Sequence, residues 1–117
     1  MLAIRGAIFV DEDTPREIEK RTNQLMDKIF SVNSIENEEV VSIIFSVTAD
    51  LRTMNPATVF RKSRHAFPSM CLQEANFIRS PNRVLRVMVL LDRKNLGSVI
   101  HVYENGAESL KDWRWSD

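Results

Sequence analysis

The sequence of 117 residues has few of the residues that define several classes of small protein. A single cysteine, Cys71, excludes an intrachain disulfide and a cysteine-rich zinc site, and it is typical of the reducing cytoplasm, where we place the protein. The two histidines, His65 and His101, lie far apart without further ligands at a suitable spacing, so we expect no metal site. Three glycines and four prolines form neither a linker nor a glycine-rich phosphate loop. The length and these absences predict one domain over residues 1–117.

An excess of charge of one sign is also absent. The 16 Lys and Arg residues balance the 16 Asp and Glu residues, and the sequence pI is near 6.7. This balance argues against a general nucleic-acid-binding protein, which usually carries a basic excess. No window of about 18 apolar residues occurs, so no membrane-spanning helix is expected. Arg5 and Gly6 interrupt the apolar N-terminal stretch where a signal peptide would continue.

One long amphipathic helix is predicted to begin after Thr14 and to end near Asn33. Thr14, Pro15 and Glu17 supply a hydroxyl cap, a proline in the first turn and a glutamate at the third helical position, which is the pattern of a capping box. Apolar residues then recur with the helical period: Ile18, Leu25, Met26, Ile29 and Phe30. A second, short helix is predicted over residues 55–61, with an asparagine cap and a proline in its first turn.

Five segments are predicted as strands, and the first of them, residues 3–10, is rich in β-branched and aromatic residues. They cover residues 3–10, 40–47, 70–77, 84–91 and 99–103, and turns are expected at residues 79–82 and 95–97. The segment 40–47 is apolar on both faces and is expected to be central in the sheet. The sequence therefore predicts an α+β domain, in which a mixed sheet of about five strands packs against one long helix and one short helix.

Three of the predicted strands carry a single charge within apolar sequence: Arg5, Glu74 and Arg86. An unpaired charge is costly to bury, so each of these side chains needs a partner, a cleft or a position at an edge. One interpretation is a structural Arg–Glu pair, or charged edge strands that prevent aggregation. The other is a pocket for an anionic ligand, because a guanidinium matches carboxylate and phosphate groups. The residues alone leave both interpretations open.

Other candidate residues give weaker signals. Cys71 has no nearby base, so it is better explained as a small buried residue than as a nucleophile. Tyr103 stands at the end of a strand, where its hydroxyl could reach a ligand or its ring could pack at an interface. Trp113 and Trp115 could cover apolar surface or contact a partner.

In their order along the chain, seven short segments resemble those of the monofunctional chorismate mutases of the trimeric mixed α/β (AroH) class. They are Ile4-Arg5-Gly6-Ala7, Asp13-Thr14, Thr48-Ala49-Asp50-Leu51, Pro56-Ala57 followed by Arg61, Cys71-Leu72-Gln73-Glu74, Leu85-Arg86-Val87-Met88 and His101-Val102-Tyr103. No single segment is specific, but seven in collinear order over a chain of suitable length form a specific pattern.

The resemblance implies a trimeric pseudo-barrel that catalyses the Claisen rearrangement of chorismate to prephenate, in phenylalanine and tyrosine biosynthesis. It implies no metal and no organic cofactor. Arg86 would place positive charge at the ether oxygen, Glu74 would accept a hydrogen bond from the ring hydroxyl, and Arg5 and Tyr103 would bind the substrate. The other implied substrate-binding residues are Met70, Cys71, Leu72, Gln73, Ala57, Thr58, Arg61 and Leu110. Of these, the residues at positions 57, 58 and 61 would face the pocket of a neighbouring subunit.

Three positions depart from the pattern of the resembled family. Asn55 stands where an aromatic residue commonly precedes the proline, Thr58 where a charged residue is frequent, and Lys111 where arginine is common. Residues 108–117 would form a mobile C-terminal tail that can close over the pocket. The first two departures support an alternative, a non-catalytic trimeric sensor of a small carboxylate metabolite. The presence of both pocket arginines, the glutamate and the tyrosine argues against it.

Overall fold

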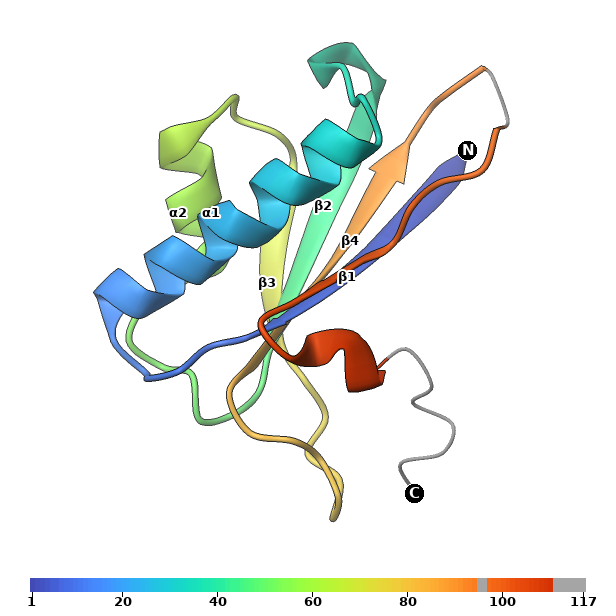
Figure 1. The fold of residues 1–117 in the computed structure, drawn as a ribbon. Helices are drawn as coiled ribbons and strands as arrows, with labels where there is room; N and C mark the ends of the chain where they lie inside the picture. Colours follow the sequence, from blue (N-terminus) through green and yellow to red (C-terminus); the bar gives the residue numbers. More distant parts are fainter. Residues whose placement is uncertain (95–96, 111–117) are drawn as a thin grey trace.

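The computed structural model describes residues 1–94 and 97–110 of the chain (Figure 1). Its elements, in chain order, are β1 (Leu2–Phe9), α1 (Pro15–Val32), the 3₁₀ helix η1 (Asn37–Glu39), β2 (Val40–Val47), α2 (Pro56–Ser63), β3 (Ser69–Gln73), β4 (Val84–Leu91) and β5 (Val102–Glu104). A further 3₁₀ turn covers residues 107–110. No helix in these described ranges is long and apolar enough to cross a membrane.

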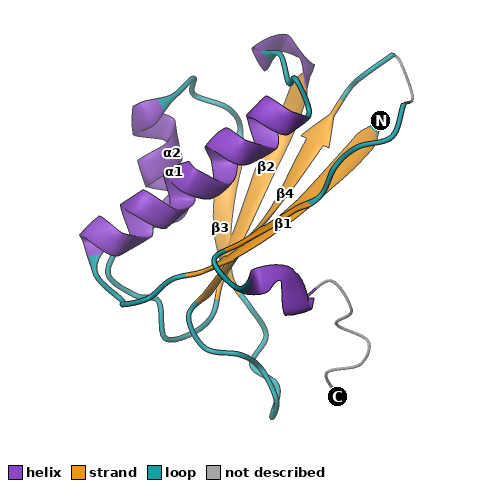
Figure 2. Ribbon diagram, viewed as in Figure 1, coloured by secondary structure: helices purple, strands orange, loops and turns teal. Residues whose placement is uncertain are grey.

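The five strands form one mixed sheet in the order β3-β2-β4-β1-β5. Strand β4 pairs antiparallel with β1 and with β2, whereas the outer pairs β2–β3 and β1–β5 are parallel. The predicted fold class is therefore confirmed, and β2 is an inner strand, as its apolar sequence indicated. Both α-helices lie on the same side of this sheet (Figure 2).

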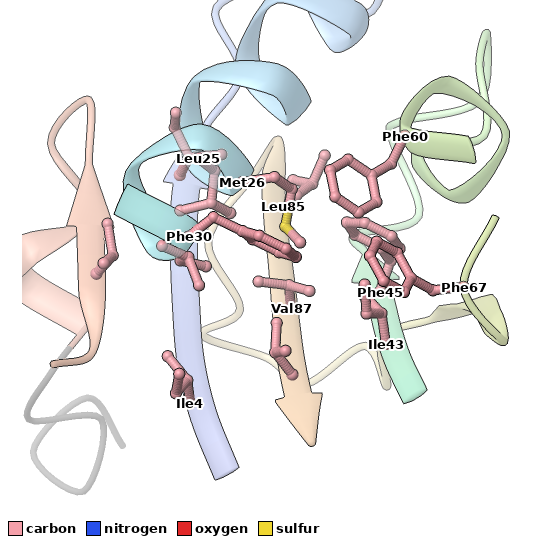
Figure 3. Close-up of a cluster of buried hydrophobic side chains, with 14 of the residues drawn as sticks. Ile4, Leu25, Met26, Phe30, Ile43, Phe45, Phe60, Phe67, Leu85 and Val87 are labelled. Carbon is pink, nitrogen blue, oxygen red and sulfur yellow. The ribbon is translucent and has the colours of Figure 1, made fainter. Parts of the chain in front are cut away.

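The core lies between the sheet and the two helices. Alternate strand residues such as Ile4, Phe45 and Val87 point toward α1 and α2 and are almost fully buried (Figure 3). At Gly6 the helix approaches the strand so closely that a Cβ atom would lie 2.7 Å from Cδ1 of Ile29. The absence of a side chain at this position therefore lets α1 pack directly on β1.

The helix ends follow most of the capping signals in the sequence. The Thr14 hydroxyl accepts a hydrogen bond from the Glu17 amide at 3.2 Å, and the Asn55 side chain accepts one from the Ala57 amide at 2.9 Å. The predicted capping box is nevertheless only half formed. The Glu17 carboxylate accepts a hydrogen bond from Nε of Arg21 at 2.7 Å, because this arginine lies one turn further along the helix.

Two strands are shorter than predicted, for reasons that depend on their neighbours. Strand β3 was expected to reach residue 77 but ends at Gln73, because β2 ends at Val47 and offers no partner beyond this point. Strand β5 was expected to begin at residue 99 but begins at Val102. Before this residue, the Asn33 side chain satisfies both the N–H and the C=O of Ile100, so no ladder forms there.

Some sequence predictions fall outside the described residues. These are the departure at Lys111, the covering role of Trp113 and Trp115, most of the tail expected over 108–117, and part of the turn expected at 95–97.

Candidate active site

The face of the sheet opposite the two α-helices, which we call the open face, carries a cavity of about 380 Å³. Four strands and the turn at 107–110 contribute its lining: Arg5, Gly6, Ala7, Ile44, Ser46, Arg86, Val87, Met88, Tyr103 and Leu110. Four of the residues predicted from the sequence, at positions 5, 86, 103 and 110, therefore meet at one cavity. The lining contains two arginines and no acidic residue, so its charge suits a small anion.

The period of two in a strand explains why these side chains meet. Arg86 of β4 pairs with Ser46 of β2 on one side and with Ala7 of β1 on the other, and Tyr103 of β5 pairs with Ala7. Directly paired residues point to the same face of a sheet. The order of the strands therefore places Ser46, Arg86, Ala7 and Tyr103 in one row across the open face.

Arg86, which lines the cavity, is held by the carboxylate of Glu74. Its Nε atom lies 2.6 Å from Oε1 of Glu74, and the two side chains are only 31% and 20% exposed. The Ser46 hydroxyl contacts the same oxygen at 3.5 Å, and the Glu74 amide is fixed by donating to the Val47 carbonyl at 2.8 Å. Within the described residues, the Nη atoms of Arg86 have no hydrogen-bond partner. The structural pair and the anion pocket are therefore not alternatives, because the pair fixes one edge of the guanidinium and leaves its other edge available.

Arg5 reaches the same cavity from β1 and is exposed. Its backbone N–H donates to Nδ1 of His101 at 3.0 Å. Burial, and then the positive charge of Arg5, lowers the pKa of His101 below its ordinary value. The imidazole that contacts the Arg5 backbone is thus favoured in its neutral form near pH 7.

The four consecutive residues predicted on β3 divide between the two faces of the sheet. Met70 and Leu72 are 54% and 51% exposed and pair with Ile44 and Ser46, so they extend the open face beyond the cavity. Cys71 pairs instead with Phe45 and packs against the core. Gln73 lies two residues from Cys71 and pairs with Val47, so it is on the same face of the sheet as the cysteine.

The environment of Cys71 argues against nucleophilic chemistry. Burial raises the pKa of its thiol, which disfavours the reactive thiolate. The resemblance had led us to expect Cys71 in the lining of the pocket. In this chain its side chain packs against the core, and it is not among the residues that line the cavity. Ala57, Thr58 and Arg61 lie on α2, on the helix-covered side of the sheet, and none of them lines the cavity of their own chain.

Sequence reasoning missed six lining residues: Gly6, Ala7, Ile44, Ser46, Val87 and Met88. Parity could have found Ala7 and Met88, because each lies two residues from a predicted arginine on the same strand face. Which residue of β2 pairs with Arg86 could not be read from the sequence. In the part of the chain that the structure describes, no group of three or more potential metal ligands occurs.

Comparisons with known proteins agree on one family. The sequence model of chorismate mutase type I matches residues 1–113. The chain is 38% identical over 111 residues to the chorismate mutase AroH of Thermus thermophilus, covering 92% of this chain and 91% of the relative. It is 36% identical over 88 residues to the chorismate mutase AroH of Bacillus subtilis, covering 74% and 69% of the two chains. A solved chorismate mutase from Clostridium thermocellum superposes with a TM-score of 0.87 at 35% identity, covering 94% of this chain and 100% of that one.

Proposed function

The chain belongs to the chorismate mutase type I family and is therefore an isomerase; from this premise we propose that the cavity on the open face is where it converts chorismate to prephenate. This conversion is intramolecular. One carbon–oxygen bond breaks while one carbon–carbon bond forms, and no group is transferred to the protein. The protein needs only to hold a compact conformer of the dianionic substrate and to stabilise the charge that develops on the ether oxygen.

The observation that carries this proposal is the pair of Arg86 and Glu74 at the cavity. Because Glu74 binds Nε at 2.6 Å, the guanidinium has one fixed orientation and does not have to reorganise during the reaction. Its Nη atoms are the donors that we assign to the ether oxygen. An arginine stays charged at any physiological pH, so the stabilising charge is always present.

The remaining side chains of the cavity suit the rest of the substrate. We assign the substrate carboxylates to Arg5 and Tyr103, which line the cavity together with Arg86. Glu74 uses Oε1 for Arg86 and Ser46, so Oε2 is available to accept the ring hydroxyl of the substrate. This set of interactions requires neither a metal nor an organic cofactor.

A homotrimer with sites between subunits is part of the proposal. The open face carries exposed apolar side chains, including Met70, Leu72 and Met88, and neither α1 nor α2 covers it. Such a patch on a small domain is typical of an interface. Thr58 and Arg61 belong to α2, which lies on the other side of the sheet, so we assign them to the pocket of a neighbouring subunit. Analytical ultracentrifugation tests this assembly, and a monomer at micromolar concentration would contradict it.

The defining experiment is to incubate the protein with chorismate and to follow the loss of its ultraviolet absorbance. We expect conversion to prephenate by the wild type and a decrease in kcat of about 10²- to 10³-fold in Arg86→Ala, because a donor directed at developing charge is lost. Arg86→Lys should recover only a small part of kcat, because an ammonium cannot contact both Glu74 and the substrate as the guanidinium does. Arg16→Ala, an exposed arginine on α1, is the matched control and should be unaffected.

Each outcome of this experiment has a distinct meaning. Equal turnover in the wild type and in Arg86→Ala would contradict the role of this side chain. A folded wild type that binds chorismate in calorimetry and returns it unchanged would instead support a sensor of a carboxylate metabolite. A cytoplasmic location is proposed with this function and is supported by the single cysteine.

A further inference from the structure

We propose that His101 is a positioning residue, whose imidazole accepts the backbone N–H of Arg5 and so fixes where the Arg5 side chain enters the cavity. This inference rests on the proposed role of Arg5 in binding the substrate. It is carried by a contact between two segments 96 residues apart in the sequence, in which the Arg5 nitrogen lies 3.0 Å from Nδ1 of His101.

The contact occurs where the β1–β5 ladder ends. The parallel register pairs Gly6 with Val102, Ala7 with Tyr103 and Ile8 with Glu104. One step further back, the same register would place Arg5 beside His101, but residues 98–101 form no strand. The imidazole nitrogen therefore takes the place of the missing backbone acceptor. Without the imidazole, the Arg5 N–H at this edge would have to donate its hydrogen bond to water.

The segment that carries His101 is itself anchored to α1. The Asn33 side chain accepts a hydrogen bond from the Ile100 amide at 2.8 Å and donates one to the Ile100 carbonyl at 2.9 Å. Its amide group also donates to the Ile29 carbonyl at 3.0 Å, which ties it to the end of the helix. A buried asparagine thus holds Ile100, and the next residue in the chain, His101, holds Arg5. These contacts connect the end of α1 to a residue that lines the cavity.

The contact requires a specific protonation state of His101. Nδ1 can accept only while it carries no proton, so the neutral imidazole has its proton on Nε2. Protonation would remove the acceptor and place a second positive charge beside Arg5. Arg5 on β1 is the charged group acting on the ring, and Asn33, which holds the neighbouring residue, is neutral.

Two substitutions separate the hydrogen bond from the imidazole ring. His101→Asn keeps an acceptor near the position of Nδ1 but cannot be protonated at neutral or mildly acidic pH, whereas His101→Ala has no acceptor. At pH 7.5 we expect His101→Ala to raise KM for chorismate about three- to tenfold with kcat within twofold of the wild type, because one hydrogen bond that orients a binding group is lost. His101→Asn should restore KM to within about twofold. His65→Asn, which changes the only other histidine, is the matched control.

The pH dependence gives a readout that a merely structural role would not produce. As pH falls through the pKa of His101, KM should rise for the wild type and for His65→Asn but stay level for His101→Asn. The inference is overturned if His101→Ala keeps the KM of the wild type, or if His101→Asn is as impaired as His101→Ala.

Amide hydrogen exchange of Arg5 separates this inference from the proposed function. Exchange should be faster in His101→Ala than in the wild type and should return to a slow rate in His101→Asn. If the wild type does not convert chorismate, the proposed function fails, and these exchange rates alone decide whether the contact exists. If the wild type is active and exchange is equal in all variants, the positioning role is wrong.

Discussion

The two faces of the sheet differ in what they contact, although the same strands build both. On β4, Val87 points into the core and is 4% exposed, whereas its neighbour Met88 points to the open face and is 37% exposed. The covered face packs against the α-helices and is almost entirely apolar. The open face carries Arg86 and Arg5 around a cavity. The alternation of a strand therefore separates the residues that hold the fold from those that can act on a ligand.

Substitutions on the covered face should therefore lower stability, whereas substitutions on the open face should lower turnover. The largest effect is expected on the covered face. Phe45→Ala removes a fully buried ring that packs near Phe60 at a centroid distance of 6.3 Å. We expect a loss of about 3–5 kcal/mol in the free energy of unfolding. Thermal denaturation at one fixed protein concentration measures this loss.

Turnover in the fraction that stays folded should change much less in the same variant. Val41→Ala, at an exposed position of the same strand, is the control and should cost no more than about 0.5 kcal/mol. A variant at position 45 that kept its stability but lost turnover would break the distinction between the two faces.

The open face should respond in the opposite way. Glu74→Gln keeps an acceptor for Arg86 but removes the negative charge that orients the guanidinium at 2.6 Å. We expect kcat/KM to fall about 10- to 100-fold, while the free energy of unfolding changes by less than about 1 kcal/mol, because the pair is partly exposed. Steady-state kinetics and denaturation of one preparation measure both. A large loss of stability with normal turnover would show that the pair is structural only.

A smaller effect is expected at Gly6, where helix α1 approaches strand β1 closely. In Gly6→Ala the new methyl group would lie 2.7 Å from Cδ1 of Ile29 and 3.1 Å from Cγ1 of Val87. We expect a loss of about 1–3 kcal/mol, because α1 must shift or its side chains must leave their rotamers. Urea denaturation measures it. Combining the change with Ile29→Val, which removes the closest atom, should cost less than the sum of the two single changes. A cost equal to that sum would show that this contact is not the cause.

Much of the fold could be predicted because the decisive signals are local. Strand β4 was predicted at its observed bounds, because a run of apolar residues follows a turn. The caps at Thr14 and Asn55 were also visible, because each hydroxyl or amide stands just before a proline. The ends of β3 and β5 were not visible, because they depend on where a different strand stops and on an asparagine far away in the sequence.

The site could be predicted only in part, for a related reason. A lone charge within an apolar strand is detectable from the sequence, and it indicated Arg5, Glu74 and Arg86. Ser46 gave no such signal, because a serine in a strand is ordinary until its pairing with Arg86 is known. The side on which Cys71 lies was in principle predictable, since it has the opposite parity to Glu74. The catalytic roles of these residues stay predictions.

The smallest effect is expected at Glu39 and Arg93, which do not line the cavity, and it tests how much a partly exposed ion pair contributes to stability. The hydrogen bond from Arg93, supported by the Glu36 amide, lowers the pKa of Glu39 to about 2 against a small opposing effect of burial. The closest approach of the pair is 2.7 Å. Because this pKa is lower in the folded state, the stabilisation is complete above the ordinary value of 4.5 and is lost as pH falls toward about 2.

Glu39→Gln should therefore lower the free energy of unfolding by at most about 1 kcal/mol near pH 7, since solvent screens the pair. The difference from the wild type in chemical denaturation should shrink between pH 4.5 and 2. Glu38→Gln, one residue earlier and exposed, should show neither effect, and an equal loss in both variants would assign the effect to general charge instead of to this pair.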